Sequence, residues 1–401
     1  MEIDIGRGKK GRRAYGFDDI AIVPSRRTRD PDDIDISWTL GPYRFELPLV
    51  ASAMDGVVSP DTAALVNQLG GLGVLNLEGI WTRFENAEEE LEKIAAAPKD
   101  VATRMMQEIY AEPVKAELVG QRIAEIKEMG AVACGSLTPQ RVRDFYEIAV
   151  EAGIDILVIQ GTVISAEHVS TSVEPLNLKE FIAEVPVPTV VGGCASYSTG
   201  LHLMRTGAVG VLVGVGPGAA CTTRGVLGIG VPQATAIADV AAARSQHMLE
   251  TGEYVNVIAD GGMRTGGDVS KAIACGADAV MVGSPLARAK EAPGRGYHWG
   301  MATFHPSLPR GTRVSTTQDG TMEEILLGPA QENDGTFNLM GALRTSMATC
   351  GYEDIRSFQR AEVMVAPALM SEGKKLQQEQ AVGMGSNGRA SVSAAVGVAD
   401  D

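Results

Sequence analysis

The chain of 401 residues is predicted to be an α/β protein that folds as a (β/α)8 TIM barrel. From about residue 46, short apolar and β-branched segments alternate with longer helical patterns, which is typical of strand–helix units around a parallel sheet. Eight such segments occur, and eight units favour a closed barrel over an open, doubly wound sheet. Glycine clusters lie at or near the ends of several of these segments, where barrel enzymes bind their ligands.

The predicted strands are short and rich in valine, isoleucine, leucine and alanine. In chain order they are Pro48–Ala53, Leu72–Leu77, Ala131–Gly135, Ile154–Gln160, Thr189–Gly193, Val209–Gly214, Asn256–Asp260 and Ala279–Gly283. Amphipathic helical patterns follow most of them, as in 139–152 and 232–250.

Residues 1–373 are therefore expected to form a single catalytic TIM-barrel domain. A charged, helical-looking insertion at 85–128 separates the second and third strands. Residues 374–401 contain mostly small and polar residues and are predicted to be a disordered tail.

The charge balance limits the kinds of ligand and partner. Lysine and arginine total 35 against 50 aspartate and glutamate residues, which gives a formal net charge of −15. Such a charge repels nucleic acid and anionic membranes, so neither is expected as a partner. A phosphate ligand would instead be bound locally, by backbone N–H groups.

The sequence contains no apolar run long enough to span a bilayer, and a cytoplasmic location is expected. Its five cysteines are scattered and include no Cys-x-x-Cys pair, which argues against a disulfide framework and a structural zinc site.

The loops after the last two strands can hold a ribose 5′-phosphate. They contain Asp260, Gly261 and Gly262 after the seventh strand, and Gly283 and Ser284 after the eighth. Glycine N–H groups and a serine hydroxyl can donate to phosphate, and a carboxylate can accept from both ribose hydroxyls. From this loop alone, however, Asp260 could equally cap the helix that follows.

A candidate nucleophile lies in the glycine-rich loop after the sixth strand. Residues 214–224 read Gly-Val-Gly-Pro-Gly-Ala-Ala-Cys-Thr-Thr-Arg and are followed by Gly-Ile-Gly-Val-Pro-Gln at 228–233. An exposed cysteine at the catalytic rim with Arg224 nearby can favour the thiolate. Cys221 is therefore the predicted nucleophile, and the other four cysteines are expected to be small buried hydrophobes.

At these motifs the chain resembles the IMP dehydrogenase/GMP reductase family, in particular an IMP dehydrogenase-like branch without the regulatory CBS module. The cysteine loop carries the resemblance, together with segments in the family's order from about residue 15 to 365: Phe17-Asp18-Asp19-Ile20, Pro48 to Asp55, Asp260-Gly261-Gly262, Met281-Val282-Gly283-Ser284, Glu291-Ala292-Pro293-Gly294 and Gly300-Met301.

The resemblance implies a role for each matching residue. Cys221 would attack the purine at carbon 2 and Thr223 would assist proton transfer. The residues expected to bind the nucleotide are Ser52, Met54, Asp260, Gly261, Gly262, Gly283, Ser284, Gly300 and Met301. Those expected at the NADPH/NADP or NAD cofactor are Gln160, Gly161 and Thr162. Carbonyls of Gly216, Gly218 and Cys221 would bind a monovalent cation such as K⁺, and the family commonly forms homotetramers.

Departures from the family pattern concern the ligands. Ala219 replaces a common serine, so one hydroxyl donor to phosphate is absent. His298, beside Tyr297, occupies the position of a tyrosine that binds phosphate in the family. Gln160 stands where cofactor loops often carry aspartate, which leaves open how the nicotinamide ribose is bound.

The direction of the reaction depends on the predicted flap at 300–330. Dehydrogenases of the family activate water with an Arg-Tyr pair there, but this stretch has only Arg310 and Arg313 and no tyrosine. A reductase needs no hydrolysis, so GMP reductase is predicted first, with GMP and IMP as the nucleotides. IMP dehydrogenase is the second hypothesis, and a non-catalytic nucleotide sensor the third.

Two features count against the reductase. The glutamate that family reductases pair with the threonine is replaced by Pro309-Arg310-Gly311, and Glu323 and Glu324 are expected to lie on a solvated helix face. Reductases of the family also tend to have glycine at the position of Ser284.

Overall fold

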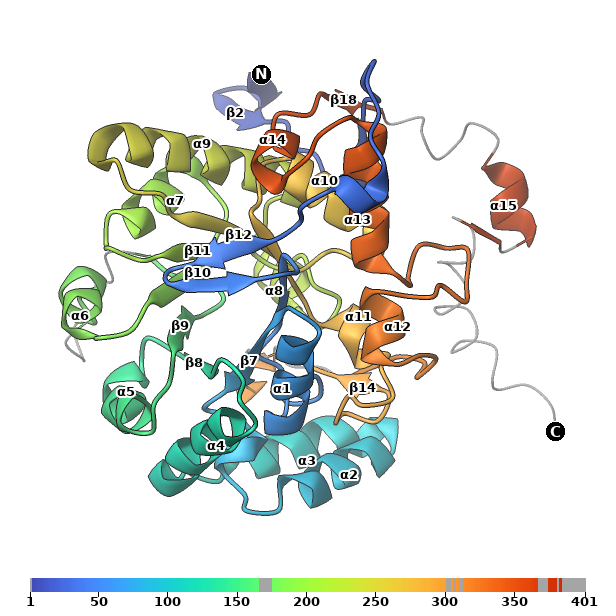
Figure 1. Ribbon diagram of the computed structural model, residues 1–401. Helices are drawn as coiled ribbons and strands as arrows, with labels where there is room; N and C mark the ends of the chain where they lie inside the picture. Colours follow the sequence, from blue (N-terminus) through green and yellow to red (C-terminus); the bar gives the residue numbers. More distant parts are fainter. Residues whose placement is uncertain are drawn as a thin grey trace.

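A closed barrel of eight parallel strands forms the centre of the molecule, as predicted (Figure 1). The computed structural model describes residues 2–165, 175–300, 304–305, 308–309, 313–366, 374–380 and 382–383. The barrel strands are β6 (Leu49–Ala51), β7 (Leu72–Asn76), β8 (Cys134–Leu137), β9 (Ile156–Gln160), β10 (Thr189–Cys194), β11 (Gly210–Val213), β12 (Asn256–Asp260) and β13 (Ala279–Val282). β13 pairs with β6 through Val280↔Leu49 and Met281↔Val50, which closes the barrel.

Helices cover the outside of the barrel (Figure 1). Those between consecutive barrel strands are α1 (Pro60–Gln68), α2 (Ala87–Ala96), α3 (Lys99–Ala111), α4 (Ala116–Glu128), α5 (Val142–Glu151), α6 (Leu178–Glu184), α7 (Tyr197–Met204), α8 (Thr223–Leu227), α9 (Gln233–Thr251) and α10 (Gly266–Ala274). After β13 come α11 (Ser284–Ala287), α12 (Met322–Leu326), α13 (Leu339–Thr349), α14 (Ile355–Phe358) and α15 (Lys375–Gln380).

Short two-stranded sheets and 3-10 turns surround the barrel. The strand pairs are β1 (Glu2–Gly6) with β2 (Lys9–Arg12), β3 (Ile20–Ile22) with β18 (Val363–Val365), β4 (Trp38–Leu40) with β5 (Tyr43–Phe45), β14 (Tyr297–His298) with β17 (Val314–Ser315), and β15 (Phe304–His305) with β16 (Leu308–Pro309). The 3-10 turns are η1 (Phe17–Asp19), η2 (Pro31–Asp33) and η3 (Ile80–Thr82).

The barrel interior is a packed apolar core. Inward-facing strand residues such as Val158 and Met281 cluster with Trp38 and Phe45 of the β4–β5 hairpin. The two aromatic rings lie 5.6 Å apart, and the Trp38 indole N–H donates to the carbonyl of Leu47 at 2.8 Å. Because side chains fill this interior, a ligand site is expected at the rim of the barrel.

Most predicted strands match the observed ones, but the third is shifted. It was predicted at Ala131–Gly135, and β8 spans Cys134–Leu137. The N–H of Ala131 donates to Ile126 of the preceding helix, and that of Ala133 donates to the Asp155 carboxylate at 2.8 Å. These amides are therefore unavailable to a strand ladder, and pairing begins only at Cys134.

The predicted insertion at 85–128 contains α2, α3 and α4. α4 contacts α1 and α5, the helices of the neighbouring units, and therefore serves as the regular helix between β7 and β8. The additional structure is the pair α2–α3 (residues 87–111), which lies at the lower edge of the molecule in Figure 1.

Part of the predicted disordered tail is helical. Lys375–Gln380 form α15, while 384–401 fall outside the described residues. Among the residues that the structure describes, no helix is long and apolar enough to cross a membrane.

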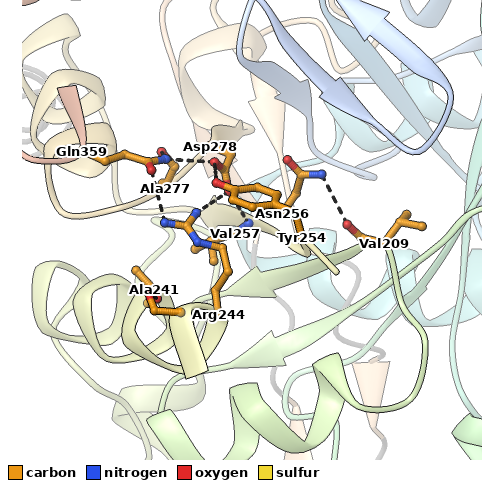
Figure 2. Close-up of polar contacts among 10 residues, drawn as sticks. Val209, Ala241, Arg244, Tyr254, Asn256, Val257, Ala277, Asp278 and Gln359 are labelled. Atoms are coloured by element: carbon orange, nitrogen blue, oxygen red, sulfur yellow. Dashed lines mark hydrogen bonds and ion pairs between the residues drawn. The ribbon is translucent and has the colours of Figure 1, made fainter. Parts of the chain in front are cut away.

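A polar network lies near the N-terminal ends of β12 and β13 (Figure 2). The Asp278 carboxylate accepts from Arg244 at 2.7 Å, from the Tyr254 hydroxyl at 2.5 Å and from the backbone N–H of Val257 at 2.8 Å. The Gln359 amide donates to Asp278 at 2.9 Å and accepts from Arg244 at 3.2 Å. Each buried charge here has a partner, so the network ties α9 and the segment after α14 to the barrel.

Candidate active site

The cysteine loop and the loop after β12 lie directly against each other. A side chain at Gly261 would bring its Cβ within 3.3 Å of the Gly218 nitrogen, and one at Gly262 would come within 3.1 Å of Pro217. Both glycines also have positive φ, 77° and 84°. Glycine is therefore required here for conformation and for close approach.

Cys221 is half-buried at the catalytic end of the barrel, in the loop between β11 and α8. Its thiol donates to the Thr223 hydroxyl oxygen at 3.2 Å, and its N–H donates to the carbonyl of Gly218 at 3.1 Å. Thr223 itself is buried, so its hydroxyl is held beside the sulfur. The geometry brings the predicted nucleophile and the predicted proton-transfer residue into contact.

The other cysteines have environments that suit structural residues. Cys134, Cys194 and Cys350 are buried and Cys275 is half-buried. Burial raises the pKa of Cys194 to about 12 and that of Cys275 to about 11, which keeps both as neutral thiols at physiological pH.

Arg224, expected near the thiol, hydrogen-bonds to the backbone at both ends of its loop. Its guanidinium donates to the carbonyl of Val215 at 3.3 Å and to that of Val231 at 2.7 Å. A Cβ at Gly216 or Gly230 would lie 2.8 or 2.7 Å from the Arg224 side chain. Both glycines of the motif therefore make room for an arginine that joins the two ends of the loop.

Asp260 ends β12 with a carboxylate that has one partner within the described residues, the Gln160 amide at 3.3 Å. The pKa of Asp260 is about 7, above the ordinary value of 3.8, because burial raises it by more than the hydrogen bond from Gln160 lowers it. The helix-capping alternative is wrong, because Thr265 caps α10 by accepting from the N–H of Asp268 at 3.2 Å.

Gln160, predicted to bind the cofactor, lies at the end of β9 with its amide nitrogen on Asp260. Its amide oxygen is buried and has no partner among the described residues. The neighbouring Gly161 takes part in the β9–β10 region, since its N–H donates to Gly192 at 2.9 Å, while Thr162 is half-buried at the rim. Gln160 therefore faces the predicted ribose subsite.

Gln233 of the Gly-Val-Pro-Gln motif fixes the ends of two strands. Its amide nitrogen donates to the carbonyl of Val213 in β11 at 2.6 Å and to that of Asp260 in β12 at 3.1 Å. The motif thereby positions the backbone of Asp260 next to the cysteine loop.

The predicted base and phosphate residues meet around the end of β13. A Cβ at Gly283 would lie 2.4 Å from the Met54 sulfur and 3.6 Å from the Cβ of Ser52. The Ser284 hydroxyl lies 2.8 Å from Nε2 of His298, a buried residue whose pKa burial lowers to about 4. Nδ1 of this neutral histidine is buried and unpartnered among the described residues. Gly300 follows Trp299 at this edge, and Met301 lies outside the described residues.

The comparisons agree with this geometry. A sequence model of the IMP dehydrogenase / GMP reductase domain matches residues 14–376. The chain belongs to this family. It is 48% identical, over 90% of its length and 99% of the relative's, to an uncharacterized oxidoreductase of Mycolicibacterium smegmatis. It is 27% identical to the inosine-5′-monophosphate dehydrogenase of Methanocaldococcus jannaschii, over 90% of this chain and 94% of that relative.

A solved structure extends the likeness to three dimensions. The IMP dehydrogenase/GMP reductase-like protein of Corynebacterium glutamicum matches with a TM-score of 0.87 and 46% identity, over 91% of this chain and 98% of that chain. The present chain is accordingly an oxidoreductase of the IMP dehydrogenase/GMP reductase family with a TIM-barrel fold.

Reasoning from the sequence did not find a buried cluster beside the site. Asp55 and Trp299 are almost completely buried, and both hydrogen-bond to Tyr110 of α3. The three residues are far apart in the chain, and no spacing rule connects them. A buried aspartate after the apolar β6 was the one available signal.

Proposed function

We propose that this protein is a GMP reductase that converts GMP and NADPH to IMP, ammonia and NADP through a covalent adduct on Cys221. Asp260 would accept hydrogen bonds from the ribose hydroxyls, and the N–H groups of Gly262 and Gly283 with the Ser284 hydroxyl would donate to the phosphate. Ser52, Met54, Gly300 and Met301 would line the base.

The chemistry assigned to this chain uses the sulfur and the hydroxyl beside it. Sγ of Cys221 would bond to carbon 2 of the purine, and the bond from carbon 2 to the exocyclic nitrogen would break as the amine leaves with a proton. Thr223, 3.2 Å from the sulfur, is placed to relay that proton. A bound nicotinamide would supply hydride chemistry. Cys221 would leave as the thiolate when the carbon–sulfur bond breaks and carbon 2 takes the hydride in its place.

Support for a cofactor contact comes from the rim after β9. Gly161 and Thr162 are half-buried and Val163 is exposed, so this loop is accessible at the C-terminal rim of the barrel. Gln160 offers its unpartnered oxygen there, while its nitrogen serves Asp260. A monovalent cation would be held by the carbonyls of Gly216, Gly218 and Cys221, and the Gly218 carbonyl already accepts from Cys221 with one of its lone pairs.

The reductase proposal rests on the contacts that engage the guanidinium of Arg313. Its guanidinium donates to the carbonyls of Ile94 and Ala97 at the end of α2, the latter at 2.9 Å, and lies 4.0 Å from the centre of the Tyr297 ring. An arginine held in this way is not available to activate water. Arg310, the other arginine of the stretch, lies outside the described residues, and the proposal takes it that no base is supplied there. Hydrolysis of a covalent adduct without a base would be about 10² to 10⁴-fold slower.

Glu323 and Glu324 do not supply the missing acid–base residue in this arrangement. Glu324 closes the capping box of α12 by accepting from the N–H of Thr321 at 2.8 Å, and Glu323 is exposed. Proton transfer is therefore assigned to Thr223 alone.

IMP dehydrogenase is the second candidate, favoured by relatives that bear this name, including the enzyme of Borreliella burgdorferi at 32% identity over 70% of this chain. The test is to incubate the purified protein with GMP and NADPH, and separately with IMP and NAD, while following the absorbance of the reduced nicotinamide. Continuous NADPH oxidation with release of ammonia is expected. Steady XMP formation from IMP and NAD, without NADPH oxidation, would replace the proposal by the dehydrogenase.

A non-catalytic nucleotide sensor is the third candidate. It would bind GMP or IMP in the same assay conditions and produce no absorbance change with either cofactor. The contact between Cys221 and Thr223 argues against it, because a sensor needs no hydroxyl beside a thiol.

A further inference from the structure

Tyr110 is a point at which the α2–α3 insertion reaches the active-site rim. This tyrosine lies in the last turn of α3 and its hydroxyl donates to the Asp55 carboxylate. The same hydroxyl oxygen accepts from the indole N–H of Trp299 at 2.7 Å. We call Asp55, Tyr110 and Trp299 the Tyr110 cluster.

The cluster joins the two segments that lead to the predicted base pocket. Asp55 directly follows Met54 in the loop after β6, and Trp299 directly precedes Gly300. These segments also touch through their backbones: the N–H of Gly294 donates to the carbonyl of Gly56 at 3.0 Å. A Cβ at Gly56 would lie 2.8 Å from the carbonyl oxygen of Tyr297 and 3.3 Å from the Trp299 ring.

The Asp55 carboxylate is held in a site with few compensating charges. Its exposed fraction is 1%, and burial raises its pKa to about 6. The Tyr110 hydroxyl is the strongest influence that lowers this pKa, followed by the N–H of Ile80, the Arg83 charge and the Asn76 amide at 3.4 Å. A buried carboxylate that loses a hydrogen-bond donor pays a large desolvation penalty, so its loop must move or take up a proton.

The insertion is attached to the rim at further points on the same side. Arg313 joins the C-terminal end of α2 to the ring of Tyr297, two residues before Trp299. Arg295 also pairs with Glu92 of α2 at 2.9 Å, although both side chains are exposed. The insertion is therefore fixed to the 294–300 segment along both of its helices.

From these contacts we infer that Tyr110 is a positioning residue for the purine base: it holds the Met54 loop and the Gly300 segment at the separation that the base requires. The inference rests on the proposed function, because it takes Met54 and Gly300 as walls of the base pocket. Tyr110 acts through Asp55 and Trp299, whereas the ribose residue Asp260 has a separate partner, Gln160. The phosphate residue Ser284 contacts His298, which directly precedes Trp299.

Because Asp260 has a partner outside the Tyr110 cluster, the inference can be tested with Tyr110→Phe, which removes the hydroxyl and keeps the ring. Binding of GMP, IMP and ribose 5-phosphate to the full chain would be measured by calorimetry. The nucleotide dissociation constants should rise by about tenfold, the effect expected when a hydrogen bond to a charged group is lost. The constant for ribose 5-phosphate should stay within about twofold, because that ligand has no base.

Tyr146→Phe provides the matched control, since the hydroxyl of Tyr146 in α5 has Glu147, at 3.1 Å, as its hydrogen-bond partner among the described residues. Its affinities for all three ligands should equal those of the unmodified protein. Trp299→Phe removes the indole N–H that donates to Tyr110. It should weaken the binding of GMP and IMP but not that of ribose 5-phosphate. Combined with Tyr110→Phe it should add little, because the two changes break one chain of hydrogen bonds.

The outcomes separate this inference from the proposed function. If the unmodified protein binds neither GMP nor IMP, the proposed function fails and the inference with it. If the unmodified protein binds them and Tyr110→Phe binds them equally well, only the inference is overturned. Equal weakening for nucleotides and ribose 5-phosphate would also overturn it, since a general loosening of the rim would have that effect.

Discussion

Asp278 and Asp260 are carboxylates near opposite ends of the same barrel, and their surroundings differ sharply. Asp278 precedes β13 and accepts hydrogen bonds from Arg244, Tyr254, Gln359 and the backbone N–H of Val257 (Figure 2). Asp260 ends β12 at the catalytic end, with the Gln160 amide at 3.3 Å as its partner among the described residues.

The same contrast holds for the neighbouring polar groups. At the N-terminal end, the Arg244 charge is balanced by Asp278 and its ring contact with Tyr254 lies at 5.0 Å. At the C-terminal end, the amide oxygens of Gln160 and Gln233 and Nδ1 of His298 are buried and unpartnered among the described residues.

Unpartnered buried polar atoms cost stability. Both ring nitrogens of His247 in α9 are also buried and unpartnered among the described residues, so such atoms are not confined to the catalytic end. At the strand ends, however, Asp278 has several partners and Asp260 has one, from which we infer that the N-terminal strand ends contribute stability and the C-terminal strand ends keep hydrogen-bonding capacity for a ligand.

The largest effect expected at the C-terminal end is that of Cys221→Ala. Removal of the nucleophile should lower turnover at least about 10³-fold, because the covalent adduct forms on the sulfur that lies beside Thr223. The nucleotide dissociation constant and the midpoint of thermal unfolding should stay nearly unchanged, as the thiol is half-buried. Steady-state kinetics, calorimetry and thermal unfolding measure the three quantities, with Cys275→Ala as the control. Substantial remaining turnover would exclude Cys221 as the nucleophile.

The next effect concerns the N-terminal end and should affect stability instead. The Arg244 side chain is 10% exposed, and Asp278→Ala leaves its guanidinium without a charge partner. Breaking a buried ion pair in this way should lower the free energy of unfolding by about 3 to 5 kcal/mol.

Denaturant unfolding measures the free energy of unfolding of Asp278→Ala. Steady-state kinetics of the folded protein measure its Michaelis constant for the nucleotide. That constant should equal the unmodified value. A large change in it, with unaltered stability, would contradict the assignment of this end to stability.

Asp260→Ala should show the opposite pattern. Each hydrogen bond from a ribose hydroxyl to the charged carboxylate contributes about 1.5 to 3 kcal/mol, so the Michaelis constant for the nucleotide should rise by roughly tenfold or more. Stability should fall little or even rise, because the substitution removes a carboxylate whose charge is disfavoured by burial. The same two measurements apply, and an unchanged Michaelis constant would exclude the ribose assignment.

The sequence predicted which residues lie at the catalytic end, because this depends on local chemistry, but it predicted nothing about the Asp278 network. The glycines at 261 and 262 and the thiol at 221 are recognisable from residue type, order and the position of loops after strands. The barrel itself followed from the repeated alternation of strands and helices. The family resemblance supplied the roles of individual residues.

Other features could not be read from the sequence because they depend on contacts between distant segments. The shift of β8 results from the Asp155 carboxylate, which takes the N–H of Ala133 out of the ladder. Likewise, the hydrogen bonds from the Arg224 side chain to the carbonyls of Val215 and Val231 depend on how the loop folds back on itself. The partner of Gln160 is Asp260, which lies 100 residues away, and the sequence of neither strand predicts this contact.

The smallest expected effect is a pH dependence that arises from Asp260. Its pKa in the folded protein is about 7, above the ordinary value of 3.8, so the folded state binds more protons than the unfolded state between these values. The contribution of Asp260 to stability is therefore fully present below about pH 4 and is lost as the pH rises to about 7. Nucleotide affinity should follow the reverse trend, because the ionised carboxylate accepts from the ribose hydroxyls.

A comparison with Asp260→Asn isolates this effect, since the nucleotide phosphate titrates identically with both proteins. The ratio of the two dissociation constants should favour the unmodified protein increasingly as the pH rises through about 7. His298 should not contribute there, because burial keeps its pKa near 4. Gln160→Leu should move the midpoint upward, since the amide hydrogen bond lowers the pKa of Asp260. A ratio that stays constant from about pH 5 to about pH 8 would mean that Asp260 is already ionised throughout, and that the catalytic end satisfies its carboxylate as fully as the N-terminal end satisfies Asp278.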